Sequence, residues 1–159
     1  YGEWVGGKPL LIPKDVQADR NISKYPLEDM IKSLVRLSVL ENIRAITIFL
    51  DVTYINPEKS SGSLWDFPEI PNKICILSAS SNGETSQVYG NKKHSFFTYS
   101  FLKALSGGAD DGDNVLELGE LTEYVYKKLP EYIRDVPGSL KQNPKFNGMD
   151  LKRTILDLR

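Results

Sequence analysis

The chain has 159 residues, of which 40% are hydrophobic and 26% are charged. This length and balance fit one compact domain with a core of its own, and they exclude intrinsic disorder. The formal net charge is −1, and no apolar run approaches the roughly 20 residues of a membrane span. We therefore expect neither nucleic acid nor a membrane as a partner.

The single cysteine excludes an internal disulfide framework. It fits a reducing compartment, so we expect a cytoplasmic protein. No signal-peptide pattern is visible, but the chain begins at Tyr1 rather than methionine. We therefore expect it to be a fragment or a processed product.

The first third of the chain predicts a strand, a helix and a second strand. Residues 8–13 are a short apolar run that a proline closes, which is typical of a strand. A helix is expected from Pro26, because proline suits the first turn and the following acids favour its positive end. Its apolar residues fall on one face: Leu27, Met30, Ile31, Leu34 and Val35. Residues 44–53 are continuously hydrophobic and rich in β-branched side chains, which predicts a central strand covered on both faces.

The middle of the chain alternates between loops and a buried strand. Residues 56–72 carry many Pro, Ser and Gly residues, a composition typical of a long loop. Residues 74–77 predict another buried strand, and residues 78–91 predict a polar loop rich in small residues.

The last third predicts two helices and a closing strand. One helix is expected over residues 97–105, ended by a Gly-Gly pair, and another over 118–129. We expect Pro130 to bend or end the second helix, because proline lacks the N–H that a helix interior needs. Residues 151–158 are expected to form a closing strand. Strands that alternate with helices predict an α/β fold with a mostly parallel sheet.

Two of the predicted strands end in polar residues. Asp51 and Thr53 lie at the end of the strand of residues 44–53, and residues 78–81 follow the next strand. Because ligands of such sheets bind at the carboxyl ends of the strands, the candidate site is expected there.

Five sequence blocks, taken in order, carry a family resemblance. The first three are Leu10-Leu11-Ile12-Pro13-Lys14-Asp15, Tyr25-Pro26-Leu27 and Leu50-Asp51-Val52-Thr53-Tyr54. The fourth is Ile76-Leu77-Ser78-Ala79-Ser80 with Glu84-Thr85-Ser86-Gln87 and Lys93-His94-Ser95-Phe96-Phe97-Thr98-Tyr99. The fifth is the acidic turn of residues 108–113 with Gly119-Glu120-Leu121. In these blocks the chain resembles the caspase-like cysteine peptidases, especially their bacterial and metacaspase branches. The resemblance covers nearly the whole chain and implies a three-layer α/β fold, with a mostly parallel central sheet flanked by helices.

The resemblance also implies how the domain is organised. Residues 1–159 would form a single caspase-like domain, with residues 1–55 as the part that carries the catalytic strand. Residues 56–72 would be a long loop or a linker between subunits, and residues 73–159 would resemble the small subunit. The first strands of the family domain would be missing from this chain.

The family uses a cysteine thiolate that attacks the peptide carbonyl and a histidine that acts as its acid/base partner. The resemblance places Thr53 at the nucleophile position. The histidine of caspases lies roughly 50 residues upstream of the cysteine, which places Tyr1 at the base position and Gly2 at the oxyanion position. A hydroxyl needs a strong adjacent base, which a neutral phenol does not supply near pH 7. Thr53 is therefore expected to be non-catalytic.

Asp51 matches the acid that, in the metacaspase branch, helps to form the pocket for a basic side chain. A carboxylate there would attract Arg or Lys through charge-assisted hydrogen bonds. The alternative is a strand-end aspartate that is bonded to nearby backbone amides. Ser80, at the second strand end, and Glu84, in the facing loop with Asn82, are further candidates for substrate binding. Glu84 has the alternative of a solvated loop charge.

Three other features are expected to be structural. His94, the only histidine, precedes a helix at a position where the family has a non-catalytic residue. Cys75 lies in the middle of a strand and is expected to be buried and inert. The run from Asp110 to Glu120 resembles a calcium loop, but counted from Asp110 its Glu is one residue short and no glycine stands at the sixth position. We expect a solvated acidic turn there, and neither a metal nor a cofactor for the chain.

Taken together, the sequence predicts a catalytically inactive pseudopeptidase. It would bind a protein or peptide partner, or regulate an active relative by pairing with it as a homo- or heterodimer. One alternative is an active caspase- or metacaspase-like cysteine endopeptidase whose nucleophile has been replaced. Another is a receiver-like module with Asp51 as phosphoacceptor, although no acidic cluster near the first strand supports it.

Overall fold

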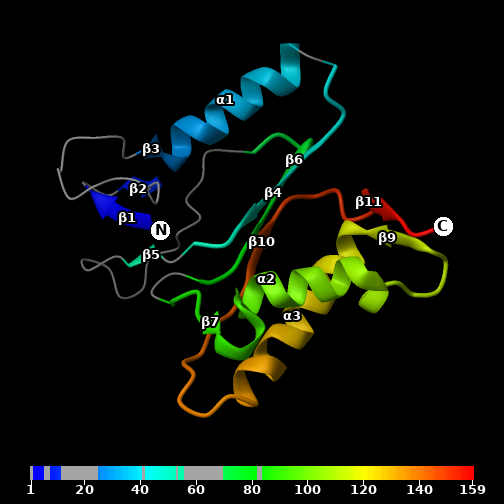
Figure 1. The fold of residues 1–159 in the computed structure, drawn as a ribbon. Coiled ribbons are helices and arrows are strands. Elements are labelled where there is room, and N and C mark those ends of the chain that lie inside the picture. The colour runs from blue at the N-terminus through cyan, green and yellow to red at the C-terminus, as the bar shows by residue number, and fades with distance from the viewer. Residues whose placement is uncertain are drawn as a thin grey trace.

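The structure is a computed structural model that describes residues 2–5, 8–11, 25–40, 42–52, 54–55, 70–81 and 84–159. Among these residues the chain forms three α-helices and four small sheets, which confirms a mixed α/β fold (Figure 1). Tyr1, Thr53, Asn82 and residues 56–69 of the predicted long loop lie outside the described residues.

The three-stranded sheet contains β4 (Ile46–Leu50), β6 (Ile74–Ser78) and β10 (Lys145–Asn147), in the order β10-β6-β4. β4 and β6 run parallel, and β10 runs antiparallel to β6. β6 is buried at every position, whereas β4 is fully buried only at its last residue. Among the described strands, β6 takes the central place predicted for residues 44–53, because it pairs along both of its edges. β4 packs against helices on both of its faces, as predicted.

Helices lie on both faces of this sheet (Figure 1). α1 (Leu27–Leu40) packs its predicted apolar face on one side, where Leu27 and Ile31 join Ile74 and Ile76 of β6 in one buried cluster. α2 (Phe96–Lys103) and α3 (Leu118–Arg134) cover the other side around Leu77. Neighbouring residues of β6 thus face different helices, as the alternation of side chains along a strand requires.

The second sheet has four short strands in the order β3-β2-β1-β5. They are β1 (Gly2–Val5), β2 (Lys8–Leu11), β3 (Tyr25–Pro26) and β5 (Tyr54–Ile55). β1 and β5 run parallel, and the other two pairs are antiparallel. The described strands therefore form short sheets of mixed direction rather than one mostly parallel sheet, because hairpin-like neighbours pair antiparallel.

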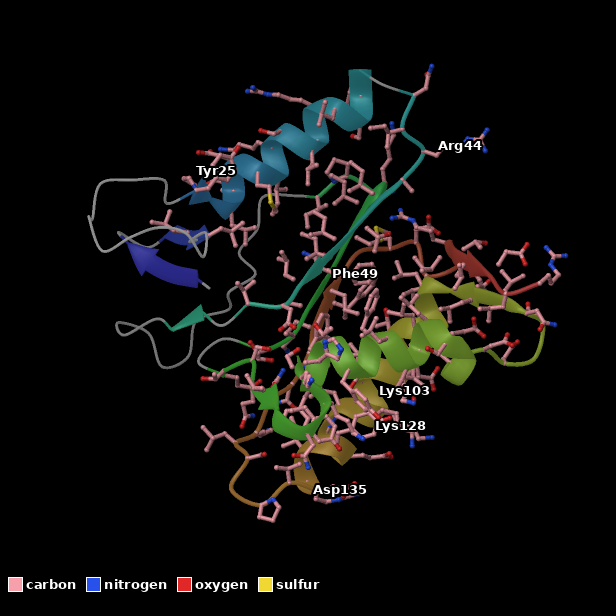
Figure 2. All side chains as sticks on the ribbon, in the orientation of Figure 1. Tyr25, Arg44, Phe49, Lys103, Lys128 and Asp135 are labelled. Atoms are coloured by element: carbon pink, nitrogen blue, oxygen red, sulfur yellow. The ribbon has the colours of Figure 1, made fainter. Side chains whose placement is uncertain are left out.

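The remaining short elements surround α2. The polar loop predicted over residues 78–91 contains β7 (Val88–Tyr89), which pairs with β8 (His94–Ser95) across the 3₁₀ turn η1 (Gly90–Lys92). A wider helical turn, η2 (Ala104–Gly108), follows α2. Phe49 of β4 is labelled in Figure 2, and the centre of its ring lies 4.5 Å from the centre of the Phe101 ring in α2.

The end of α3 differs from the prediction, because the helix runs through Pro130 to Arg134. Leu129 and Ile133 on either side of the proline are buried in the core, while Pro130 itself is exposed. Burial of this apolar face outweighs the local preference of proline to end a helix.

The predicted closing strand is confirmed as β11 (Thr154–Asp157), which pairs with β9 (Val115–Glu117). None of the helices in the described part of the chain combines the length and apolar character needed to cross a bilayer.

Candidate functional site

Asp51 follows β4 directly, and three side-chain hydroxyls donate hydrogen bonds to its carboxylate. Ser86 Oγ donates to Oδ1 at 2.6 Å, and Thr98 Oγ1 donates to Oδ2 at 2.5 Å. Ser95 Oγ also donates to Oδ2. Among the described residues, the hydrogen-bond partners of Asp51 are therefore hydroxyls from two later segments of the chain.

The start of α2 places the carboxylate of Asp51 in a favourable field. Ser95 is the N-cap of α2, and its Oγ accepts the backbone N–H of Thr98 at 2.8 Å. The hydrogen of the same hydroxyl points to Asp51. Negative charge is stabilised at a helix N-terminus by the unpaired amides and the helix dipole. Asp51 remains exposed, so a charged and oriented acceptor is accessible to solvent.

The strand end beside Asp51 belongs to β6. The backbone N–H of Ala79 donates to the carbonyl of Leu50 at 2.8 Å, which continues the β4–β6 pairing beyond the last ladder position. Ser80 follows and is only 1% exposed. Its Oγ has no hydrogen-bond partner among the described residues. A buried hydroxyl is normally paired, so Ser80 is the unsatisfied polar group near this strand end.

Glu84 is held by a distant segment of the chain. Its Oε2 accepts the backbone N–H of Ser81 at 3.2 Å and that of Asn143 at 2.6 Å, and its Oε1 accepts the side-chain amide of Asn143. Glu84 is half-buried. The carboxylate of Glu84 is therefore bonded to Ser81 and Asn143, whereas the alternative interpretation treated it as a solvated loop charge.

Two glutamines fix the loop that carries Ser86. The side chain of Gln87 bonds both backbone groups of Leu140, accepting from its N–H at 2.7 Å and donating to its carbonyl. Gln142, which is 1% exposed, accepts the N–H of Gln87 at 3.0 Å and donates to the carbonyl of Ala79 at 2.9 Å. Sequence reasoning missed Gln87 and Gln142 as site residues. They lie in irregular segments where no periodicity marks burial.

The structure places only the neighbours of the two positions that the resemblance assigned to a catalytic dyad. Thr53 and Tyr1 lie outside the described residues, whereas Gly2 lies in β1 and pairs in register with Tyr54 of β5. The residue after Tyr1 is therefore the cross-strand partner of the residue after Thr53.

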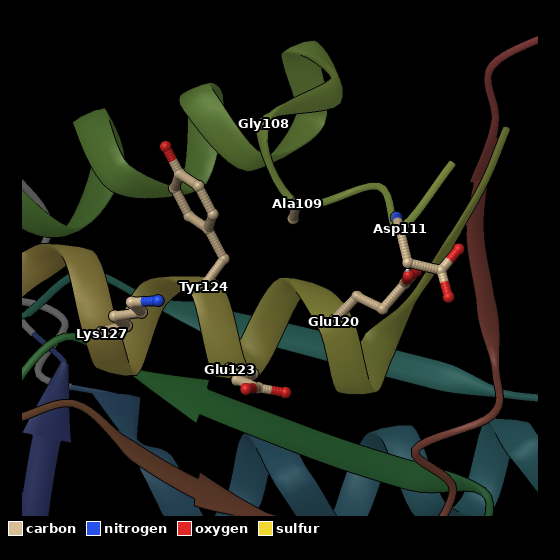
Figure 3. Close-up of a pocket in the computed structure, with 7 residues that line it drawn as sticks. All are labelled: Gly108, Ala109, Asp111, Glu120, Glu123, Tyr124 and Lys127. Atoms are coloured by element: carbon tan, nitrogen blue, oxygen red, sulfur yellow. Dashed lines mark hydrogen bonds between the residues drawn. The ribbon is translucent and has the colours of Figure 1, made fainter. Parts of the chain in front are cut away.

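A cleft of about 350 Å³ lies beside the acidic turn (Figure 3). Its lining is Gly108, Ala109, Asp111, Glu120, Glu123, Tyr124 and Lys127. In the adjoining turn, carboxylate oxygens of Asp110, Asp111 and Asp113 lie within 4.8 Å of one another. Each of these carboxylates accepts a backbone N–H within the turn, from Asn114, Asp113 and Val115 respectively. The acids therefore shape the turn itself.

The other two residues that the sequence singled out lie apart from the carboxylate of Asp51. Cys75 is fully buried in the middle of β6, as expected. His94 begins β8 and is exposed. Its neighbour Ser95, and not His94, contacts Asp51.

The sequence matches no protein-family model and no curated protein.

Proposed function

We propose that this chain is a caspase-like domain that has lost its catalytic dyad and binds a protein or peptide partner through a basic side chain at Asp51. The observation that carries the proposal is the exposed carboxylate at the end of β4, which three hydroxyls orient. A carboxylate held in this way is ready to accept a charge-assisted hydrogen bond from Lys or Arg.

The arrangement of the elements supports the family assignment. β4 and β6 are parallel neighbours whose carboxyl ends carry Asp51 and the Ser78–Ser80 segment, and helices cover both faces of these strands. On this basis we propose a three-layer caspase-like fold, in which helices flank the parallel strands β4 and β6. The proposed partner is a peptide segment or an active relative with which the domain pairs as a homo- or heterodimer.

Peptide binding tests the proposal. Peptides that differ only in one central residue, Lys, Arg or Asp, are titrated against the protein by fluorescence anisotropy. The basic peptides are expected to bind and the Asp peptide is not. Asp51→Asn keeps the shape of the side chain but removes its charge, so the affinity for the basic peptides should fall by about tenfold or more. Equal affinity of both proteins for all three peptides contradicts the proposal.

A cleavage assay tests the loss of chemistry. The same peptides are expected to stay intact after long incubation with the protein. Cleavage that Thr53→Ala abolishes would show that the hydroxyl is a nucleophile, and the pseudopeptidase proposal would be wrong.

The alternative is an active cysteine endopeptidase whose nucleophile has been replaced. The pairing of Gly2 with Tyr54 favours it, since this register brings together the neighbours of both dyad positions. The double variant Thr53→Cys, Tyr1→His tests this candidate. Cleavage of basic peptides by the double variant, blocked by a thiol reagent, supports the alternative, and a folded but inactive double variant contradicts it.

A further inference from the structure

A cleft of about 270 Å³ lies at α2, on residues that the function proposed above does not use. The turn between β7 and β8 supplies one part of its lining, and the second half of α2 with η2 supplies the other. The residues are Lys92, His94, Tyr99, Leu102, Lys103 and Ser106. None of the six is acidic, and two of them are lysines.

Both ammonium groups of this cleft lie beside the ring of Tyr99. Lys92 Nζ lies 5.6 Å from the centre of the Tyr99 ring, and Lys103 Nζ lies 5.8 Å from it. Both distances fall within the range of about 6 Å in which a ring attracts a cation. Two like charges beside one ring also repel each other, so an anion that contacts both ammonium groups would stabilise this arrangement.

No carboxylate neutralises these cations in the described part of the chain. The salt bridges found there involve Lys32, Lys128, Lys152, Arg153 and Arg159. Lys92, His94 and Lys103 take part in none of them.

Tyr132, which packs against Tyr99, does not supply a negative charge either. The ring of Tyr132 lies edge-on to Tyr99, with 5.2 Å between the ring centres. Burial and a hydrogen bond with Tyr124 raise the pKa of Tyr132 above its ordinary value, which keeps its phenol neutral. Within the described part of the chain, no salt bridge therefore offsets the positive charge of Lys92 and Lys103.

The hairpin turn presents alternate residues to the cleft. Lys92 and His94 line it, whereas Lys93 between them does not. Lys93 has a φ of 57°, in the left-handed region that side chains other than glycine seldom adopt. The turn thus holds an unfavourable backbone conformation at the residue that separates Lys92 from His94, and such positions are enriched at binding sites.

We propose that this cleft binds a phosphoryl group, supplied either by inorganic phosphate or by a phosphorylated peptide side chain. A phosphate carries close to two negative charges and several strong acceptor oxygens, which match two ammonium groups and an imidazole. Leu102 and the Tyr99 ring provide an apolar wall for the carbon atoms of an ester.

A titration in which NMR monitors the backbone amides tests this assignment. Inorganic phosphate, a phosphoserine peptide and its unphosphorylated form are each added to the protein. Saturable shifts at residues 92–94 and 103 are expected with the two phosphate compounds and not with the third. Tighter binding of the phosphopeptide identifies a peptide source, and equal affinity identifies free phosphate.

Charge variants decide whether the cleft is the site. Lys92→Gln and Lys103→Gln should each raise Kd by about fivefold or more, because each removes a charge in contact with the ligand. Lys93→Gln is the matched control, since it removes the same charge one residue away and should change Kd by less than about twofold at physiological salt.

Two results overturn the assignment: no saturable binding of either phosphate compound, or an equal loss with Lys93→Gln. Lys103 also lies in the last turn of α2, where a cation favours the helix. If Lys103→Gln loosens α2, as circular dichroism would reveal, Lys92→Gln in the hairpin decides alone.

Discussion

At the scale of single residues, the bonds to Asp51 limit which cation fits there. A carboxylate has about four lone-pair positions. Oδ2 accepts from two hydroxyls, Ser95 and Thr98, and Oδ1 accepts from one, Ser86. A guanidinium binds best through two parallel hydrogen bonds to both oxygens. That geometry is blocked at Oδ2, whereas an ammonium needs only one position on Oδ1, which accepts a single hydrogen bond from the described residues.

A peptide with Lys is therefore expected to bind at Asp51 more tightly than one with Arg, by about 1 kcal/mol, the size of one hydrogen bond. Thr98→Val frees one position on Oδ2 without touching the backbone N–H that caps α2, so it should narrow this preference. The two affinities are measured by anisotropy on both proteins. An Arg peptide that binds as well as the Lys peptide to the unchanged protein contradicts this geometry, even if binding at Asp51 itself stands.

Gly148, just after β10, shows how closely the backbone packs on β6. A Cβ at this position would lie 2.5 Å from Cys75 Sγ, 2.9 Å from Cys75 Cβ and 3.0 Å from Cys75 Cα. Gly148→Ala should therefore destabilise the protein by about 1–3 kcal/mol, the usual cost of overpacking a core. Chemical denaturation measures the change. Gly90→Ala is the control, because nothing lies within 4 Å of its Cβ position, and it should leave the protein as stable or slightly more stable.

At the scale of elements, the sequence predicts those whose pattern is local. The face of α1 around Leu27 and Ile31 and the strand at residues 74–77 follow from periodicity and hydrophobicity, and the structure confirms both. Which of β4 and β6 lies in the middle of the sheet depends on which one gains a second neighbouring strand. β10 pairs with β6 from about 70 residues away along the chain. Asp51 was predictable as a strand-end acid. Its donors Ser86, Ser95 and Thr98 were not, because only the tertiary fold brings them to it.

Pro130 carries a testable consequence of the continuous α3. Proline cannot donate to the carbonyl four residues earlier, and its ring crowds that carbonyl. Pro130→Ala restores the bond at an exposed position. The gain is reduced by the greater freedom of alanine in the unfolded chain, so a net stabilisation of about 1–2 kcal/mol is expected. A rise in the thermal midpoint confirms it. Destabilisation would mean that the proline ring makes favourable contacts that the helix geometry alone does not reveal.

At the scale of the whole molecule, Arg153 joins parts of the chain that are distant in sequence. Its side chain is 8% exposed. Its guanidinium donates to the carbonyls of Ile46 and Lys73 at 2.8 and 2.9 Å and to Thr47 Oγ1 at 3.0 Å. Its own carbonyl accepts the N–H of Leu118, the first residue of α3, at 2.8 Å. Arg153, the residue directly before β11, therefore fixes the start of β4, the turn before β6 and the start of α3.

Removal of this guanidinium should loosen the fold without altering the ligand site. Arg153→Ala leaves the carbonyls of Ile46 and Lys73 without these donors, so a loss of about 2–4 kcal/mol of unfolding free energy is expected. Arg153→Lys should recover only part of this loss, since an ammonium lacks the planar array of donors that reaches several acceptors at once. Arg159→Ala is the control, because that arginine is exposed and its one ion pair among the described residues is with nearby Asp157.

Urea denaturation of the three variants measures these changes, and peptide titration at Asp51 accompanies it. Asp51 follows the carboxyl end of β4, whereas Arg153 bonds the residues that open this strand, Ile46 and Thr47. The folded fraction of Arg153→Ala should therefore bind basic peptides with unchanged affinity. A large loss of affinity in a fully folded variant would show that the two ends of β4 are coupled. The peptide site would then depend on the packing of the whole molecule and not only on the hydroxyls around Asp51.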